Sequence, residues 1–144
     1  MKKIIILMAY AIGLAACSPT ADYKKERDEV MVFHDKVMAD HGVIVENQMK
    51  LDTLTRNLAD LKLKFPDLDT LKEKEHMVSL IAELSAAEEQ MNTWMHQFEP
   101  DVTGKSNDES ISYFKNEKLK IQSVDSLYKK EIKVSGAYLN KYQK

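Results

Sequence analysis

The sequence has a single cysteine, Cys17, among 144 residues. A disulfide within the chain is therefore excluded as a source of stability. Glycine and proline are also scarce, with four and three copies, which leaves few positions where a helix would be interrupted. Charge is abundant, since 31% of the residues are Asp, Glu, Lys or Arg, and Leu, Met and Ala are frequent. This composition favours long helices in an all-α fold.

Several signatures of function are missing as well. The chain has no glycine-rich phosphate loop, no His-Glu-x-x-His zinc motif and no Gly-x-Ser-x-Gly nucleophile motif, so nothing in the sequence indicates an enzyme. It has no basic stripe and its formal charge is −2, so nucleic acid is not an expected partner. No apolar run reaches the length of about 20 residues that a membrane-spanning helix needs.

The beginning of the chain is typical of an export signal. Two lysines precede an apolar run over residues 4–16 that is too short to span a bilayer, which is the layout of a signal peptide. The segment Leu14-Ala15-Ala16-Cys17 then resembles the lipobox of bacterial lipoproteins, in which small residues precede an obligatory cysteine. The resemblance implies that Cys17 receives a diacylglyceryl group, becomes the first residue after cleavage and is then N-acylated.

The expected domains are a signal peptide at 1–16, a lipidated tether at 17–23 and a folded domain at 24–144. The alternative for the first of these is an ordinary cleaved signal followed by an incidental cysteine. Loss of Lys2 and Lys3 takes the formal charge from −2 to −4. Two or three acyl chains would hold the protein on a membrane, at about 0.8 kcal/mol per buried CH₂. We therefore expect a location in the cell envelope, at the periplasmic or surface face of the outer membrane.

Apolar residues recur at seven-residue intervals in the first part of the mature chain, at about 22–64. The recurring positions are Val30, Val37, Ile44, Leu51, Leu58 and Phe65. A sustained heptad of this kind predicts a helix packed in a bundle, in the manner of a coiled coil. Gly42 lies inside the segment. Because the heptad continues in register through it, we expect one continuous helix with room to bend at that glycine.

Two more helices are expected, at about 68–97 and 106–142. Pro66 separates the helix expected at about 22–64 from the one expected at about 68–97, because the residue before a proline avoids the helical conformation. Thr70 with Glu73 offers a capping box for the second helix, with Asp67 or Asp69 as alternative caps. The apolar side of that helix is expected to carry Leu71, Val78, Ile81, Leu84, Met91, Trp94, Met95 and Phe98.

The stretch from residue 99 to residue 105 contains Pro100 and Gly104 and predicts the second loop. Ser106 and Glu109 form a capping box for the third helix. Short connections between long amphipathic helices make the neighbours antiparallel. The expected architecture is an elongated, antiparallel up-down-up three-helix bundle, roughly 45–65 Å long. The oligomeric state is not determined by these patterns.

Methionine and histidine gather on the first two helices, at His34, Met38, His41, Met91 and Met95. The first three share one helix face because of their spacing, and the two methionines of the second helix share another. If the turn centres on Pro66, the antiparallel register places Met38 level with Met95. The two clusters are therefore expected to meet, toward the end of the bundle that carries the lipidated terminus.

Thioether and imidazole ligands together suit soft or borderline metals, copper(I) above all, and a Met/His pair between helices can also ligate haem. One hypothesis is thus a metal site on these five residues, with His96 as a further candidate. The alternative is that the methionines fill the core and the histidines lie at its edge. Glu73 and His76 form one Glu-x-x-His, the spacing of di-iron bundles, but a single copy is better interpreted as a solvated face.

Three stretches resemble elements of a family of small helical bacterial lipoproteins, often labelled viral A-type inclusion protein repeat. They are His34–Met38 (HDKVM), Met91–Phe98 (MNTWMHQF) and Tyr113–Lys118 (YFKNEK). The chain is similar to this family over most of its mature length. The resemblance implies a lipoprotein with three helices and implies no activity, because the family has no assigned function.

Together these observations predict a non-enzymatic helical module anchored in the cell envelope. The membrane is an expected partner through the lipid anchor, and an envelope protein is a further one. The alternative is a copper- or haem-binding bundle that uses the Met/His cluster. The residues themselves do not decide between these two functions.

Overall fold

The computed structural model describes residues 22–142. The helices in this range are α1 (Tyr23–Arg56), α2 (Leu58–Lys64), α3 (Thr70–Gln97) and α4 (Asn107–Leu139), and α4 continues into a short 3₁₀ helix, η1 (Asn140–Tyr142). No β-strand occurs between residues 22 and 142, so the all-α prediction is confirmed. The predicted signal peptide and Cys17, the predicted site of lipidation, lie outside the described residues.

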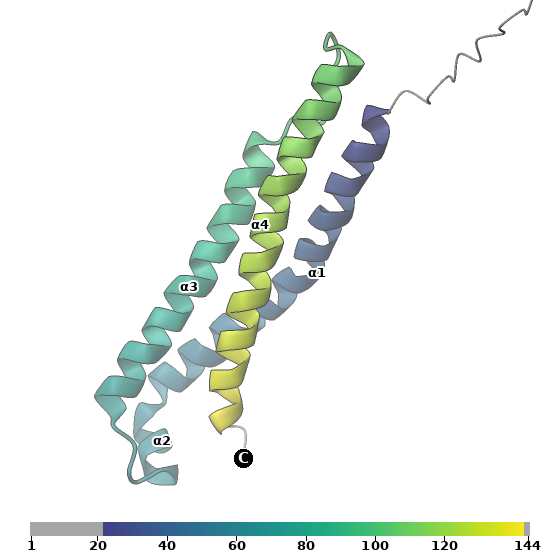
Figure 1. Ribbon diagram of the computed structural model, residues 1–144. Coiled ribbons are helices and arrows are strands. Elements are labelled where there is room, and N and C mark those ends of the chain that lie inside the picture. The colour runs from purple at the N-terminus through teal and green to yellow at the C-terminus, as the bar shows by residue number, and fades with distance from the viewer. Residues whose placement is uncertain (1–21, 143–144) are drawn as a thin grey trace, which may run out of the picture.

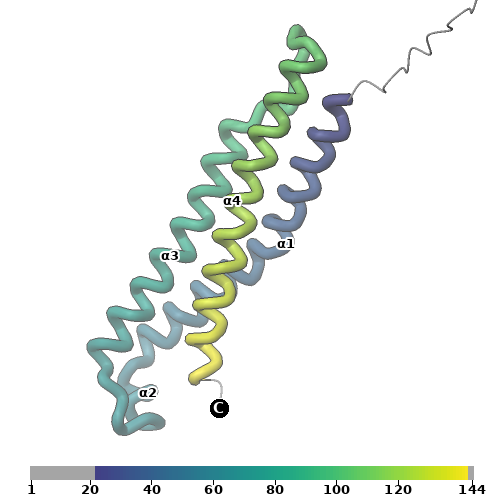
Figure 2. Tube along the Cα trace, in the orientation of Figure 1, coloured from purple at the N-terminus to yellow at the C-terminus, as the bar shows by residue number. Residues whose placement is uncertain are grey.

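The three long helices lie side by side and make the molecule elongated (Figure 1, Figure 2). The chain runs along α1, returns along α3 and runs back along α4, so that α3 is antiparallel to the other two (Figure 1). The start of α1 and the loop between α3 and α4 lie at one end, whereas α2 and the end of α4 lie at the other. None of the helices between residues 22 and 142 has the length and apolarity that crossing a bilayer requires.

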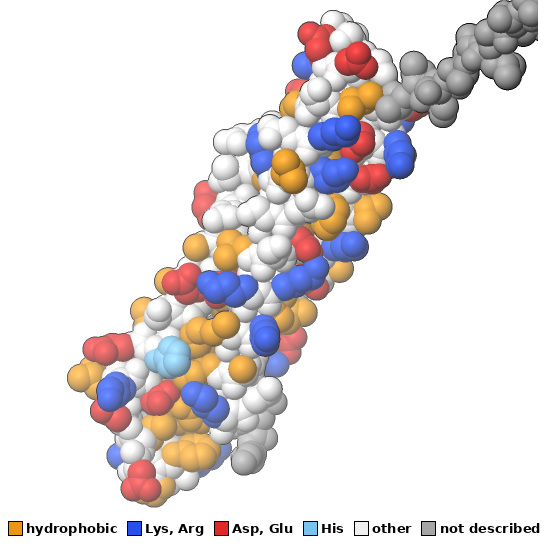
Figure 3. All heavy atoms as spheres, in the orientation of Figure 1, with side chains coloured by type: hydrophobic (Ala, Val, Ile, Leu, Met, Phe, Trp, Pro, Cys, Tyr) orange, Lys and Arg blue, Asp and Glu red, His pale blue; other side chains and the backbone are white. Residues whose placement is uncertain are grey.

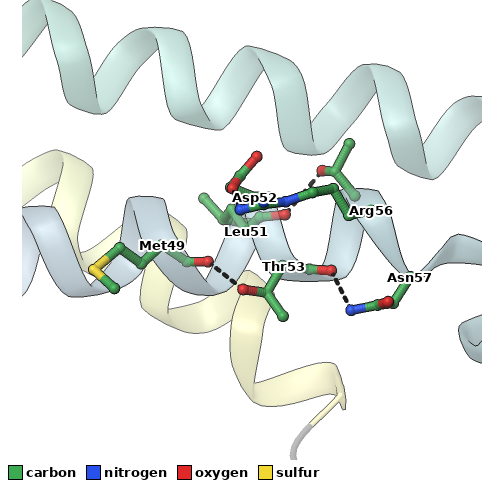
Figure 4. Close-up of polar contacts among 7 residues, drawn as sticks. Met49, Leu51, Asp52, Thr53, Arg56 and Asn57 are labelled. Carbon is green, nitrogen blue, oxygen red and sulfur yellow. Dashed lines mark hydrogen bonds and ion pairs between the residues drawn. The ribbon is translucent and has the colours of Figure 1, made fainter.

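The prediction of one continuous helix over 22–64 is wrong, because the helix is interrupted at Asn57. The Asn57 side chain donates a hydrogen bond to the carbonyl of Thr53, at 2.9 Å, and its backbone N–H points to the carbonyls of Thr53 and Leu54 (Figure 4). An asparagine side chain that bonds the backbone in this way competes with the helical pattern. The helix passes through Gly42 without a break.

The last turns of α1 run at an angle to its first turns (Figure 1). In this part of the helix, hydroxyl groups donate to carbonyls four residues back. Thr53 bonds the carbonyl of Met49 and Thr55 bonds that of Leu51, both at 2.8 Å (Figure 4). Both bonds lie in the angled part of α1, and bonds of this kind often bend a helix.

The remaining helix ends agree closely with the caps expected from the sequence. Ser106 and Glu109 form the predicted capping box at the start of α4. Asp69, rather than Thr70 with Glu73, caps α3, and its side chain accepts from the backbone N–H of Lys72 at 3.2 Å. Gly104 has a φ of +88°, a conformation that favours glycine and turns the chain tightly before α4.

The heptad of α1 forms the centre of the hydrophobic core. Val30, Val37, Ile44 and Leu51 are all fully buried between the other two long helices. On α4, the buried apolar residues include Phe114, Ile121, Tyr128 and Leu139.

The apolar side expected for α3 is partly wrong. Met77 is 0% exposed and takes the core position, whereas Val78 is 51% exposed and Leu71 also faces solvent. The sequence is apolar at both 77 and 78, so periodicity alone does not choose between the two faces. Packing against α1 and α4 together makes that choice.

Polar residues cross-link α1 and α4 at two heights. Near the α2 end, the buried Asn47 donates to the Ser135 hydroxyl at 2.8 Å, and Ser135 donates to the carbonyl of Glu131. Near the other end, the Lys118 ammonium bonds Glu26 and Glu29, each at 2.7 Å. A buried polar pair is satisfied in one register only, so the Asn47–Ser135 bond favours a single alignment of the two helices.

Substitution at adjacent positions tests the orientation of α3. We expect Met77→Ala to lower the free energy of unfolding by about 2–5 kcal/mol, because it leaves a cavity in the core. Val78→Ala is the matched control and should change that energy by less than about 0.5 kcal/mol. Urea denaturation followed by circular dichroism measures both. Equal losses in the two variants would contradict the orientation described.

Candidate functional site

The predicted Met/His residues of α1 lie along the seam between α1 and α3. The His34 ring centroid is 6.2 Å from that of Trp94, and His41 Nδ1 is 3.7 Å from Glu88 Oε1. One heptad further along, Gln48 donates to the same Glu88 carboxylate at 2.6 Å. Positions 34, 41 and 48 of α1 therefore all face α3, as expected for antiparallel neighbours.

The five residues of this cluster differ in their surroundings. Met91 is buried in the core, whereas Met38 and Met95 are 41% and 39% exposed. His34 and His41 are half-buried. The seam thus has methionine and histidine at its surface and one methionine, Met91, beneath it. His96, the further candidate, is exposed.

Both imidazoles turn the same nitrogen toward a carboxylate. His34 Nδ1 lies 3.0 Å from Asp35 Oδ1, as His41 Nδ1 lies near Glu88. A carboxylate at one ring nitrogen orients the other one, which is a common arrangement behind metal-ligating histidines. Within residues 22–142, no three His, Cys, Asp or Glu side chains are grouped so that they could hold a metal ion. A site here would depend on methionine sulfur.

Beside the cluster, a buried hydrogen bond connects α3 to α4. The indole N–H of Trp94 donates to Glu117 Oε2 at 3.0 Å, and the other carboxylate oxygen accepts from the Lys120 ammonium at 2.7 Å. Trp94 also stacks on Phe98, with 4.7 Å between ring centroids. Burial of Glu117 was missed by the sequence analysis. The available signal was its position three residues after Phe114 and four before Ile121, which places it on the apolar stripe.

At the opposite end, two tyrosines converge on one carboxylate. The hydroxyls of Tyr138 and Tyr142 donate to Glu73 Oε2, at 2.5 and 2.8 Å. The Tyr138 hydrogen bond is the main reason why the pKa of Glu73 is lowered, and burial followed by this same bond raises the pKa of Tyr138. The interpretation of Glu73 as part of a solvated face is therefore wrong, while His76 is exposed and sets its ring edge-to-face on Tyr138.

Two open grooves flank the end of α4 near this tyrosine pair. The first, which we name the α1/α4 groove, has a volume of about 500 Å³ and is lined mainly by Met49, Thr53, Leu54, Leu139 and Tyr142. Glu46 and Lys50 also line it and neutralise each other in an ion pair of 2.6 Å. Its surface is therefore largely apolar and carries no net charge.

The second groove, which we name the α3/α4 groove, has a volume of about 510 Å³. Its apolar lining residues are Val134, Ala137 and Tyr138, and its basic ones are Lys130, Lys133, Lys141 and His76. Figure 3 shows hydrophobic side chains over the lower parts of α3 and α4, with lysine or arginine side chains and a histidine beside them. This groove combines an apolar surface with positive charge.

Two buried polar atoms of α4 have no hydrogen-bond partner among the described residues, Asp125 Oδ1 and the Tyr128 hydroxyl. Burial, with a smaller contribution from the Glu88 carboxylate, raises the pKa of Tyr128 to about 12. The phenol is therefore protonated at neutral pH. Neither group opens onto the two grooves as a lining residue.

The tyrosine–carboxylate cluster should make stability depend on pH. Because the pKa of Glu73 is lowered from 4.5, its hydrogen bonds stabilise the fold above about pH 4.5, and this stabilisation is lost as the pH falls through the depressed value. We expect Glu73→Gln to be less stable than the wild type at pH 7, with a difference that shrinks toward pH 3. Urea denaturation across this range is the measurement. The exposed Glu75→Gln is the control, and an equal response of both variants would contradict the assignment.

Comparison of the chain with protein-family models, with curated proteins and with solved structures finds no match in any of the three. The resemblance to small helical lipoproteins therefore stays a prediction.

Proposed function

We propose that this chain is a lipid-anchored protein of the bacterial cell envelope that acts as a non-enzymatic helical binding module. In this proposal residues 1–16 are a cleaved signal peptide and Cys17 carries the lipid. The support for the anchor is the lipobox-like Leu14-Ala15-Ala16-Cys17 after a short apolar run with a basic start. In the same proposal residues 22–142 act as an antiparallel bundle of three long helices, with α2 as a short appendage to the first.

The observation that carries the binding role is the pair of open, apolar grooves beside the end of α4. Their volumes of about 500 and 510 Å³ fall in the range of small-ligand sites, which are mostly apolar with a few polar groups. Exposed apolar surface that is gathered in one place commonly marks a site of interaction. Met49, in the first groove, and Val134, in the second, are both exposed.

The position of the grooves fits a module that is held on a membrane. The first helix begins at Tyr23, six residues after Cys17, and the grooves lie at the opposite end of the bundle. A helix of 34 residues is about 50 Å long at 1.5 Å per residue. The α1 residues of the first groove follow Tyr23 by 23 to 31 positions, so the grooves would lie roughly 35–45 Å along the bundle from its lipid-bearing end, toward ligands or envelope proteins at a distance from the anchoring leaflet.

Copper(I) binding at the α1/α3 seam is the second candidate function. It is favoured by the two imidazoles whose Nδ1 atoms lie near carboxylates, which leaves both Nε2 atoms as ligands. Met38 on α1 and Met95 on α3 are both accessible and would supply the soft sulfur atoms that copper(I) prefers. Haem at the same seam remains the other form of this proposal.

The anchor is tested by substitution of its cysteine. We expect Cys17→Ala to abolish incorporation of labelled glycerol and palmitate and to release the protein from the membrane fraction, because the thioether to the lipid can no longer form. Ser18→Ala should leave both unchanged and is the matched control. Lipid incorporation that persists in Cys17→Ala would rule out the proposed attachment.

The metal proposal makes a separate prediction. Titration of the protein with copper(I) should quench the fluorescence of Trp94, whose ring neighbours His34. Replacement of His34 by Gln together with Met38 by Leu should abolish the quenching, whereas His76→Gln, at the other end of the bundle, should not affect it. A parallel titration tests haem. The proposal fails if there is no quenching and native mass spectrometry detects no bound metal or haem.

A further inference from the structure

The tyrosine–carboxylate cluster at the α2 end of the bundle brings three oxygen atoms close together. The hydroxyl oxygens of Tyr138 and Tyr142 lie 2.5 and 2.8 Å from Glu73 Oε2. Neighbouring ligands of an octahedral metal ion are about 2.8 Å apart when the bonds to the metal are about 2.0 Å long. Both hydroxyl oxygens therefore already lie at the spacing of neighbouring metal ligands from the carboxylate oxygen.

A histidine lies on the same face of α3 as this carboxylate. His76 follows Glu73 by three positions, and residues with this spacing share a helix face. Its ring lies edge-to-face on Tyr138, with 4.7 Å between the centroids, and the side chain is exposed. Rotation of the imidazole toward the three oxygens would therefore displace no core residue. The Glu-x-x-His spacing supplies two ligands to each metal site of a di-iron bundle, and here the two tyrosines take the place of a second copy.

Packing fixes the tyrosine rings and leaves the cluster open to solvent. The rings of Tyr138 and Tyr142 are 5.5 Å apart, and Phe65 packs against Tyr142 at 5.6 Å. Tyr142 lines the α1/α4 groove, whereas Tyr138 and His76 line the α3/α4 groove. An ion can thus approach the oxygens from a groove while the rings stay in place, which is the kind of rigid support that a metal site needs.

The type of donor atom favours a hard ion of high charge. Phenol and carboxylate oxygens are hard ligands, in contrast to the methionine sulfur atoms of the α1/α3 seam. A tyrosine hydroxyl ordinarily has a pKa of about 10, so at neutral pH it gives up its proton only to a strongly polarising cation. Iron(III) is a cation of this kind, and tyrosine oxygen is one of the protein ligands that iron takes.

The lysines beside the cluster also favour a trivalent ion. The Lys141 ammonium lies over the Tyr138 ring, 4.9 Å from its centroid, and Lys130 and Lys133 line the same groove. A divalent ion bound by one carboxylate and two neutral phenols keeps a positive charge, which these ammonium groups would repel. Iron(III) bound by one carboxylate and two phenolates has no net charge, because its three positive charges are matched by three anionic oxygens.

We propose that Glu73, His76, Tyr138 and Tyr142 form a binding site for iron(III). Binding forms bonds from the ion to the two phenolate oxygens, the carboxylate and the imidazole. It breaks the two phenolic O–H bonds and releases both protons to solvent, and the oxidation state of the iron does not change. Water fills the remaining positions of the octahedron. This site goes beyond the proposed binding role of the grooves and depends neither on it nor on copper(I) binding at the seam.

The test adds ferric citrate to the purified full-length protein and records the visible absorption spectrum. Iron(III) bound by tyrosinate absorbs visible light through charge transfer from the phenolate to the metal. Ferric citrate alone, or held on surface lysines, does not give this band. We expect the band to saturate at one iron per chain, and resonance Raman excitation within it to enhance the vibrations of tyrosinate.

Conservative variants show which residues hold the iron. Tyr138→Phe with Tyr142→Phe should abolish the band, and either substitution alone should weaken iron binding by about 10–100-fold or more, since loss of an outer partner of a metal site already costs that much. Tyr113→Phe is the matched control and should leave the band unchanged, because this half-buried tyrosine of α4 bonds the Glu99 backbone at the other end of the bundle.

A variant at an exposed position keeps the test decisive if the tyrosine variants do not fold. His76→Gln should shift the band and weaken iron binding, while circular dichroism shows an unchanged fold. A His34→Gln variant, at the opposite end of the bundle, should bind iron(III) as the wild type does.

Three outcomes would overturn the inference. The first is the absence of both bound iron and the band at saturating ferric citrate. The second is iron that is retained without the band, which would be adventitious binding at other carboxylates. The third is a band that persists in the double tyrosine variant, which would place the iron on other tyrosines. None of these outcomes alters lipid incorporation at Cys17 or copper(I) binding at the seam, so failure of this inference is distinguishable from failure of the proposed function.

Discussion

Enclosure of one stripe of α1 by the other two long helices is the constraint on which the rest of the structure depends. Val30, Val37, Ile44 and Leu51 have no exposed surface. Because this stripe points between α3 and α4, the positions on one side of it face α3, as His34 and Gln48 do. The positions on the other side face α4, as Glu26 and Asn47 do. The α1/α3 seam and the α1/α4 groove both follow from this division.

Hydrogen bonds between polar groups on the same helices favour one alignment of each helix along its neighbour. Asn47 reaches Ser135 in the core, and Trp94 reaches the buried Glu117. A buried donor without its acceptor costs about 1–3 kcal/mol, so a shift of one helix along another would be penalised at both places. The result is an elongated bundle whose two ends differ in chemistry. One end has methionine, histidine and tryptophan, and the other has tyrosines on Glu73 between two apolar grooves.

The candidate sites differ in how far they could be predicted. The Met/His residues were found from spacing alone, because residues four and three apart share a helix face whatever lies beside it. The grooves were not found, because a groove depends on how two helices diverge. Each groove is lined by residues from more than one element, and such a pairing leaves no periodic signal in the sequence.

The sequence by itself determined the helical class, the loops at Pro66 and Pro100, the cap at Ser106 and the buried stripe of α1. These features depend on neighbours within a few residues, or on a repeat along one helix, and such interactions are encoded locally. Only the tertiary structure decided that Met77 and not Val78 is buried, that Glu117 lies in the core, and that the hydroxyls of Tyr138 and Tyr142 meet on Glu73. Each of these features depends on contacts with a second helix. The position of that helix is set by packing across the whole molecule.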